Sequence, residues 1–408
     1  MKPFGPIPPE FGNRNGALLI ADRPAFDWVA QDGSPVFVYD AAIVAARIAQ
    51  FRAVFPNVDL HYAIKANPFP PLLTVMAPMV DGLDVASAGE LANALTVKAG
   101  DVISFAGPGK RDAELEAGIT AGVTINLESA GEASRALALG ERLGVTPRLA
   151  VRVNPDMELR GSGMKMGGRP SPFGIDAEHA AAVARQVIDA GADWRGWHIF
   201  AGSQSLDTAA IIETQGATLA LAARLSDEAG AAPPLVNLGG GFGVPYFAGD
   251  TPVDVEAVGD ALTAALSGRA DILRHSRFAI ELGRWLVAEA GVYLTRVVDR
   301  KESRGEIFLV VDGGLHHQLA ASGNFGTVVR RNYPVAVANR MGAASEETVS
   351  VVGCLCTPLD RLADRVALPR ADVGDVVAIF LAGAYGATAS PTAFLGHPAP
   401  AEVLAGAS

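Results

Sequence analysis

The side chain most clearly able to do chemistry is that of Lys65, which lies near the end of an apolar segment with the sequence HYAIKAN. The apolar run predicts a short β-strand, and the Asn67-Pro68 pair predicts its end. Desolvation at the end of a buried strand lowers the pKa of a lysine amine and makes it a nucleophile toward an aldehyde. Because most strand-end lysines are only surface or salt-bridging residues, Lys65 needs support from other segments.

Two later segments could hold an anion and a ring nitrogen. In the sequence NLGGGFG, the backbone N–H groups of Gly239, Gly240 and Gly241 could converge on a phosphate, although such a run is also a simple tight turn. In the sequence IELGR, Glu281 could face a pyridine nitrogen and keep it protonated, while Arg284 could pair with the phosphate. The simpler interpretation of the second segment is an ion pair.

The chain has two cysteines, Cys354 and Cys356, in the sequence GCLCTPLD. A disulfide between them would be strained and would close almost no loop, and two cysteines alone cannot form a structural zinc site. Free cysteines are usually buried and inert. Tyr385, between glycines in the sequence AGAYG, could pack beside a cofactor and donate its hydroxyl, although loop tyrosines usually only pack.

The adjacent histidines His316 and His317 could suggest a metal ion. Neighbouring side chains of an extended segment point in different directions, however, and no third ligand lies at a useful spacing. We therefore predict no metal site.

The elements that must position these residues follow an alternating pattern. From residue 36 to residue 282, short apolar runs alternate with Ala-rich segments of helical period, which predicts βα units with parallel strands. About eight such units over roughly 250 residues favour a closed (β/α)8 TIM-like barrel, with an open doubly wound sheet as the alternative. After residue 281 the runs are strand-like with little helical period. We predict a barrel at residues 36–285 and a second, mostly β domain from residues 1–35 plus 286–408.

Composition excludes several classes of partner. The chain of 408 residues has a formal net charge of −11, so neither nucleic acid nor an anionic membrane surface is expected to bind it. Residues 1–15 lack the apolar stretch of a signal peptide, and no long charge-free apolar run predicts a membrane span. With so few cysteines, we expect a cytoplasmic protein.

Together, these motifs resemble the fold-type III pyridoxal-phosphate-dependent decarboxylases, the family of diaminopimelate, ornithine and arginine decarboxylases. The resemblance covers essentially the whole chain, in family order, and includes the sequences DVASAGE at residues 84–90 and VRVNP around Arg152, and His198 before GSQ at residues 202–204. It implies a β/α-barrel with a β-domain, pyridoxal 5′-phosphate as cofactor, and a homodimer with two shared active sites.

The resemblance also implies roles for single residues. Lys65 would form the internal aldimine with the cofactor, His198 would stack on the pyridine ring, and Glu281 would pair with its nitrogen. Cys356 of the partner subunit would protonate the carbon that carbon dioxide leaves. Further matched positions are Asp84, Glu90 and Arg152 on the cofactor side, Ser203, Gly239, Gly240, Gly241, Arg284 and Tyr385 at the phosphate, and Thr357, Asp360, Arg330 and Tyr333 at the substrate.

A narrower resemblance joins the chain to the exosortase-system-associated decarboxylases and to the glutamyl-carrier-protein decarboxylase of aminoglycoside assembly. It depends on the sequences GSGMKMGG at residues 161–168, DGGLHH at 312–317, AASGNFG at 320–326, CTP at 356–358 and FLGHP at 394–398.

Three departures from the family pattern bear on the substrate and the site. Thr357 replaces the acid that meets a distal substrate amine in the diaminopimelate and ornithine enzymes, and an unpaired buried ammonium costs on the order of several kcal/mol. Free lysine, ornithine or diaminopimelate is therefore not expected as substrate. Pro172 replaces a basic residue, which leaves the partner of Asp360 open, and Cys354 replaces a proline and receives no role.

The predicted function is decarboxylation of the α-carboxylate of an amino acid or an amino-acid derivative, free or linked to a carrier protein. One alternative is an alanine-racemase-like enzyme, but that family uses a tyrosine as its second base where this chain offers Cys356. Another is a catalytically silent relative that binds partners. Such relatives usually lose the lysine, the cysteine or the phosphate loop, and this chain keeps all three.

Overall fold

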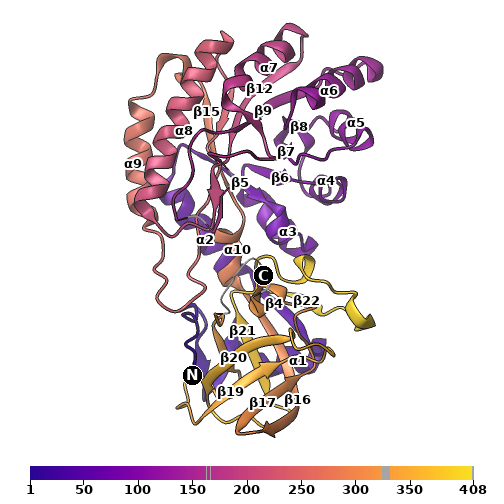
Figure 1. The fold of residues 1–408 in the computed structure, drawn as a ribbon, viewed down its shortest axis with the longest axis vertical. Helices are drawn as coiled ribbons and strands as arrows, with labels where there is room; N and C mark the ends of the chain where they lie inside the picture. Colours follow the sequence, from indigo (N-terminus) through magenta and orange to yellow (C-terminus); the bar gives the residue numbers. More distant parts are fainter. Residues whose placement is uncertain (162, 166, 324–330, 407–408) are drawn as a thin grey trace. The chain divides into compact units, whose positions relative to one another are not determined.

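The computed structural model describes residues 1–161, 163–165, 167–323 and 331–406 and divides into two compact units (Figure 1). The barrel unit comprises Ile48–Gly243 and Pro252–Gly283. The β-rich unit comprises Met1–Arg47, Val244–Thr251 and Arg284–Ser408. No helix in the described ranges is both long and apolar enough to cross a membrane.

In the described part of the chain, eight parallel strands form a closed barrel, which confirms the predicted fold class. The strands are nearly all buried because the barrel interior lies on one face and helices cover the other, so they read as apolar runs. In barrel order, the strands are β5 Asp59–Ala63, β6 Gly82–Val85, β7 Ile103–Phe105, β8 Thr124–Leu127, β9 Arg148–Asn154, β12 Asp193–Ile199, β14 Leu235–Asn237 and β15 Arg277–Leu282.

Helices follow the strands and lie outside them (Figure 1). Several begin at a side chain that accepts a backbone N–H of the first turn, as Ser87, Ser129 and Asp207 do. Glu90 of α4 accepts the amide of Ala86 at 2.7 Å. The helices are α2 Ala41–Val54, α3 Pro70–Met76, α4 Ala88–Leu95, α5 Asp112–Thr120, α6 Ala130–Leu143, α7 Ala177–Asp189, α8 Thr208–Ala229 and α9 Val255–Ser267. Short strands are β10 Met164–Lys165, β11 Ile175–Asp176 and β13 Gly202–Ser203.

The β-rich unit is built around one long strand, β16 Gly291–Ser303. Its first half pairs with β4 and β21, and its second half pairs with β17. Alternating residues such as Val292 and Leu294 face a core that includes Trp28 of α1. The remaining elements are β1 Asn13–Arg14, β2 Ala17–Ile20, β3 Arg23–Pro24, α1 Ala25–Asp32, β4 Val36–Asp40, α10 Arg284–Val287, β17 Glu306–Val311, β18 Val335–Val337, β19 Glu347–Val352, β20 Arg361–Leu368, β21 Val376–Phe380 and β22 Ala401–Ala405.

One expected barrel strand belongs elsewhere. The apolar run at residues 36–39, which sequence reasoning placed at the start of the barrel, is β4, and β4 pairs with β16 and β22 of the β-rich unit. All five residues of β4 are buried, as in a barrel strand. Its sequence therefore cannot reveal which sheet it joins.

Candidate active site

Charged and polar side chains gather at the C-terminal ends of the barrel strands, where barrels of this kind carry their functional groups. In the strand register, Arg152 of β9 lies opposite His198 of β12, and His198 lies opposite Asn237 of β14. Within the barrel unit, the structure thus brings together five of the predicted residues: Lys65, Asp84, Arg152, His198 and Glu281.

Lys65 lies directly after β5, in the single 3-10 turn Ile64–Ala66. Its Nζ atom is 3.9 Å from Oε1 of Glu281 on the neighbouring strand β15. The Lys65 side chain is 49% exposed, whereas the Glu281 side chain is 6% exposed. The amine is therefore accessible to a ligand and lies in the field of a buried carboxylate.

The buried side chains of His198 and Glu281 have polar atoms without hydrogen-bond partners. Nε2 of His198 lies 3.0 Å from Oε2 of Glu281, but the geometry is too poor for a hydrogen bond. Among the described residues, both ring nitrogens of His198 and this Glu281 oxygen have no hydrogen-bond partner, which is rare for buried polar atoms. An unsatisfied imidazole and carboxylate beside the Lys65 amine fit a ligand with an aromatic ring, a ring nitrogen and an aldehyde. Pyridoxal phosphate has all three.

The pKa values of the two buried carboxyl groups of the site are shifted in opposite directions. Burial opposes the ionisation of Glu281, but His198 and Lys65 outweigh it and lower its pKa to about 2. Burial and the repulsion of Glu281 raise the pKa of Asp84 well above its usual value. Glu281 is thus an anion that can hold a pyridine nitrogen protonated. The environment of Asp84 favours its protonated form relative to that of a free aspartate.

Two residues with no role in the sequence analysis, Ser104 and His61, contact Asp84. The hydroxyl of Ser104 on β7 donates a hydrogen bond to Asp84, and Nδ1 of His61 lies 3.7 Å from Asp84 Oδ2. Burial lowers the pKa of His61, which favours the neutral imidazole. His61 was visible as the first residue of the Lys65 segment, but a single serine within an apolar strand carries no sequence signal.

The glycine loop after β14 is folded tightly against the backbone of β15. The Asn237 side chain accepts the amide of Gly239 at 2.9 Å, and the amide of Glu281 donates to the Gly239 carbonyl at 2.8 Å. Gly239 and Gly241 have positive φ angles of 69° and 92°. A Cβ on Gly240 would lie 1.9 Å from the carbonyl oxygen of Glu281. This backbone has no room for side chains and is the kind of loop that receives a phosphate.

Comparison with known proteins identifies the family of this chain. The pyridoxal binding domain of the pyridoxal-dependent decarboxylases matches residues 41–288, more than half of the chain. The chain belongs to this family. It is therefore an enzyme, a carboxy-lyase that depends on pyridoxal phosphate.

The similar proteins are decarboxylases over nearly their whole length. The L-glutamyl-[BtrI acyl-carrier protein] decarboxylase of Niallia circulans is 38% identical over 385 residues, which cover 91% of this chain and 88% of the relative. The diaminopimelate decarboxylase of Archaeoglobus fulgidus is 32% identical over 399 residues, 97% of this chain and 93% of the relative. The crystal structure of the M. jannaschi diaminopimelate decarboxylase has a TM-score of 0.88 at 26% identity and covers 97% and 92% of the two chains. These matches favour a decarboxylase over a racemase-like enzyme.

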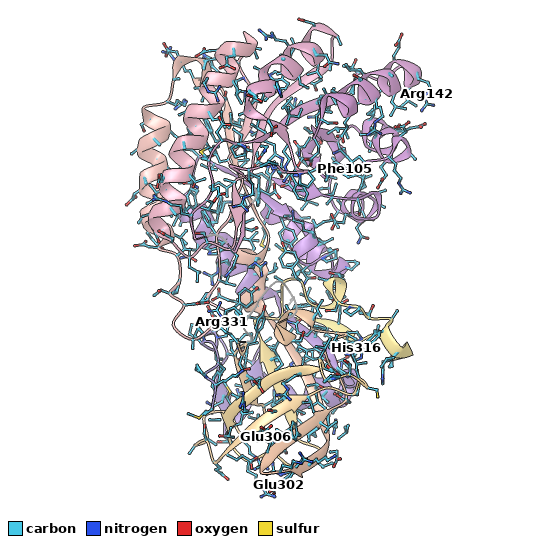
Figure 2. All side chains as sticks on the ribbon, viewed as in Figure 1. Phe105, Arg142, Glu302, Glu306, His316 and Arg331 are labelled. Carbon is cyan, nitrogen blue, oxygen red and sulfur yellow. The ribbon has the colours of Figure 1, made fainter. Side chains whose placement is uncertain are left out.

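The decarboxylase also contains a buried ion-pair network that the sequence did not reveal. Arg152 donates to Oε1 of Glu128 at 2.8 Å, and Glu128 also accepts two backbone amides. Lys110 pairs with Glu132 at 2.8 Å, and both side chains are 2% exposed. Lys110 Nζ lies 5.7 Å from the ring centre of Phe105, a residue labelled in Figure 2. These contacts fix the segments that follow β7 and β8 and hold Arg152 on β9.

In the β-rich unit of the decarboxylase, the predicted residues Arg284, Tyr333 and Tyr385 lie together around Tyr246, which sequence reasoning missed. Arg284 donates to the Tyr246 hydroxyl at 2.9 Å, and its guanidinium carbon is 4.7 Å from the centre of the Tyr385 ring. The rings of Tyr246 and Tyr333 have centroids 4.7 Å apart. Burial opposes the charge of Arg284, but the tyrosines raise its pKa above the usual value. The cluster holds a half-buried cation among aromatic rings, which suits an anionic ligand.

The remaining predicted residues belong to other segments of the chain. Between β19 and β20, Cys356 is exposed and Thr357 is half-buried, whereas Asp360 is buried and accepts two backbone amides. In the barrel unit, Ser203 lies on β13, which pairs with β10. Arg330 lies outside the described residues.

Proposed function

We propose that this decarboxylase acts on an amino acid whose far end carries no free ammonium group, and that the amino acid is joined to a carrier protein. The observation that carries the proposal is Thr357, directly after Cys356. Its hydroxyl is uncharged and lies 3.4 Å from a backbone amide of its own turn. A buried ammonium that meets no counter-charge costs on the order of several kcal/mol. The 38% identity to a decarboxylase named for a glutamyl-carrier substrate supports the carrier.

The proposed reaction gives each residue of the barrel site one task. The bound cofactor draws electrons from the substrate α-carbon so that the bond to its carboxylate can break. Lys65 would hold the cofactor covalently through its aldehyde. Glu281, ionised at every working pH, keeps the pyridine nitrogen protonated, and His198 covers the ring.

The phosphate and the final proton are assigned to other residues. The N–H groups of the glycine loop, with Ser203, Arg284 and Tyr385, are proposed to hold the phosphate. Cys356 of the partner subunit is proposed to donate a proton to the α-carbon after carbon dioxide leaves, which makes the enzyme a homodimer with shared sites. We place the enzyme in the cytoplasm, a proposal supported by its two unbridged cysteines.

Matched substrate pairs test the proposal on the cofactor-loaded enzyme. Carbon dioxide release is compared for free glutamate and carrier-linked glutamate, and for free lysine and lysine acylated on its side-chain nitrogen. We expect faster turnover of the carrier-linked or acylated member of each pair, and no turnover by Lys65→Ala. Faster release from free lysine, ornithine or diaminopimelate would contradict the assignment of Thr357. Equal rates with free and carrier-linked glutamate would remove the carrier from the proposal.

A further inference from the structure

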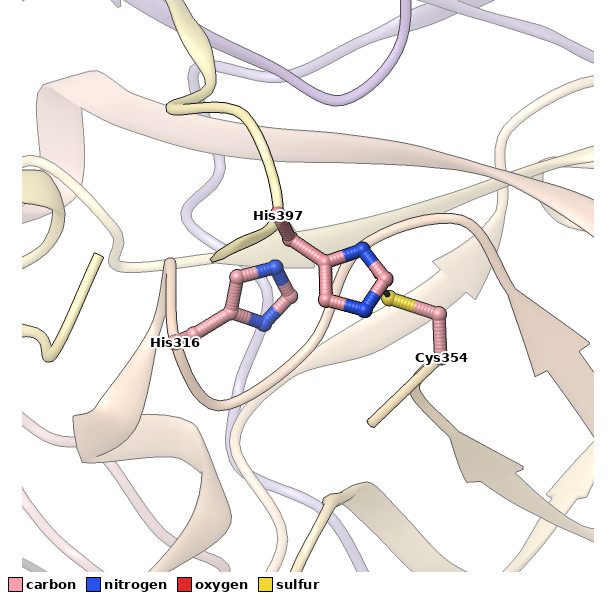
Figure 3. Close-up of side chains that lie close together, drawn as sticks. All are labelled: His316, Cys354 and His397. Atoms are coloured by element: carbon pink, nitrogen blue, oxygen red, sulfur yellow. Dashed lines mark hydrogen bonds between the residues drawn. The ribbon is translucent and has the colours of Figure 1, made fainter. Parts of the chain in front are cut away.

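Three potential metal ligands from distant segments meet in the β-rich unit: His316, Cys354 and His397 (Figure 3). One ligand atom of each lies within 4.8 Å of the others, and Sγ of Cys354 is 3.8 Å from Nδ1 of His397. His316 follows β17, Cys354 follows β19, and His397 follows the short 3-10 turn Phe394–Gly396. No third ligand lies near the histidine pair in the sequence, because the fold alone brings Cys354 and His397 to it.

The buried imidazole of His316 is available to coordinate a metal ion. The residue, labelled in Figure 2, is fully buried, and neither ring nitrogen has a hydrogen-bond partner in the described part of the chain. Burying an imidazole without a partner costs free energy, so such groups in proteins usually have a ligand or a function.

Asp360 accepts backbone hydrogen bonds from two of the three segments that carry the ligands. Its Oδ1 accepts the amide of Leu315, next to His316, at 2.7 Å, and its Oδ2 accepts the amide of Leu355, next to Cys354, at 2.8 Å. A Cβ at the glycine before either segment would lie within 2.5 Å of this carboxylate. One buried carboxylate therefore fixes the backbone of both ligands.

His317 hydrogen-bonds to the segment that carries the third ligand, His397. It is not a ligand itself, because both of its ring nitrogens form hydrogen bonds. Its Nε2 donates to the carbonyl of Pro398, next to His397, at 2.9 Å, because a carbonyl oxygen can only accept. Its Nδ1, 2.9 Å from the Tyr293 hydroxyl, then accepts from that hydroxyl. Both nitrogens of His317 are used, whereas those of its neighbour His316 remain available.

We infer that His316, Cys354 and His397 form a zinc site, with water as the fourth ligand. Two imidazoles and a thiolate suit Zn²⁺, and supporting contacts that orient ligands are typical of such sites. A tetrahedron with Zn–N bonds of about 2.0–2.1 Å and a Zn–S bond of about 2.3 Å needs ligand atoms roughly 3.3–3.6 Å apart. The present cluster is slightly more open, so small side-chain shifts would close it.

Binding requires the thiol of Cys354 to release one proton to solvent. Burial, together with the charge of Asp360, raises the pKa of this thiol. The same negative surroundings attract a cation. Zinc would also fix the segment two residues before Cys356. That consequence rests on the proposed function, whereas the zinc site does not.

The test titrates the tag-free holoenzyme with Zn²⁺ alone and measures bound metal after dialysis. We expect one zinc per chain in the wild type and in two control variants, Cys356→Ser and His275→Gln, which change the other cysteine and an exposed histidine. Loss of an outer-shell partner weakens zinc binding by about 10–100-fold, so Cys354→Ser and His397→Gln should weaken it by at least ~100-fold. Equal zinc content in the wild type and Cys354→Ser would overturn the inference.

X-ray absorption on the zinc-loaded wild type decides the matter even if the variants fail to fold. One sulfur at about 2.3 Å with nitrogens at about 2.0–2.1 Å is expected. A shell without sulfur, or a wild type that retains no zinc, would overturn the site. Neither measurement depends on decarboxylation, so failure of the proposed substrate leaves the zinc result unaffected.

Discussion

Gly240 lies so close to Glu281 that a Cβ atom would sit 1.9 Å from the carbonyl oxygen of that residue. The proposed phosphate loop and the proposed partner of the pyridine nitrogen thus share one backbone contact. A side chain at position 240 must displace either the loop or strand β15, and both displacements reach the cofactor site.

Gly240→Ala should therefore lose cofactor affinity. The matched control is Gly216→Ala in α8, where a Cβ meets nothing within 4 Å and where alanine should stabilise the helix by about 1 kcal/mol. Pyridoxal phosphate content after dialysis and the urea midpoint of both variants check this. Full retention of the cofactor by Gly240→Ala would contradict a role for the loop in phosphate binding.

Asp84→Asn should stabilise the cofactor-free protein at neutral pH. The pKa of Asp84 is raised in the folded state, so the wild type loses stability as pH rises above the unfolded value near 4, because the unfolded chain ionises more readily than the folded one. Asparagine has no such proton, and its oxygen still accepts from Ser104. The difference in free energy of unfolding between variant and wild type should grow from pH 4 to pH 7.

Urea denaturation at several pH values measures that difference. The control is Asp260→Asn, which changes an exposed carboxylate on α9. A difference for Asp84→Asn that shrinks as pH rises would show that Asp84 is ionised in the folded protein.

Glu281→Gln should retain pyridoxal phosphate on Lys65 but slow decarboxylation by about 10²–10³-fold, the typical loss when one preorganised electrostatic partner is removed. A neutral amide cannot hold a pyridine nitrogen protonated. Since the pKa of Glu281 is about 2, this residue should cause no acidic limb in the wild-type rate profile above ~pH 4. Rates at equal cofactor content, with Glu256→Gln on the surface of α9 as control, decide whether Glu281 has this role.

The barrel could be predicted from the sequence because its strands are short apolar runs separated by segments of helical period. The same signal led to the wrong assignment of β4, whose five residues are buried like those of a barrel strand. Its partner β16 lies about 250 residues further along the chain, and no local pattern encodes that pairing.

The site could be predicted only where residues lie in recognisable motifs. Lys65, Glu281 and the glycines were found because each follows an apolar run at a strand end. Ser104, Glu128 and Tyr246 were missed because a single polar residue in a strand or loop has no periodicity, and its partner is set by the folded chain. The meeting of His316 with Cys354 and His397 was missed for the same reason.

Cys356→Ala should bind the cofactor normally and lose activity or change the product, because its proposed task begins after carbon dioxide has left. General acid–base groups typically contribute ~10²–10⁴-fold in rate. Carbon dioxide and the amine product are measured separately, since a misplaced proton transfer changes their ratio. A variant that turns over at the wild-type rate and yields only the amine would remove Cys356 from the mechanism.

Mixing two inactive variants tests whether the active sites are shared between subunits. Lys65→Ala and Cys356→Ala each lack one essential group, so neither homodimer has a complete site. In a mixed dimer, one site combines Lys65 of the Cys356→Ala chain with Cys356 of the Lys65→Ala chain, and the other site lacks both. With free exchange, half of the dimers are mixed and each has one good site of two, so about a quarter of wild-type activity should return. If verified exchange restores nothing, Lys65 and Cys356 act within one chain, and the shared-site arrangement is wrong.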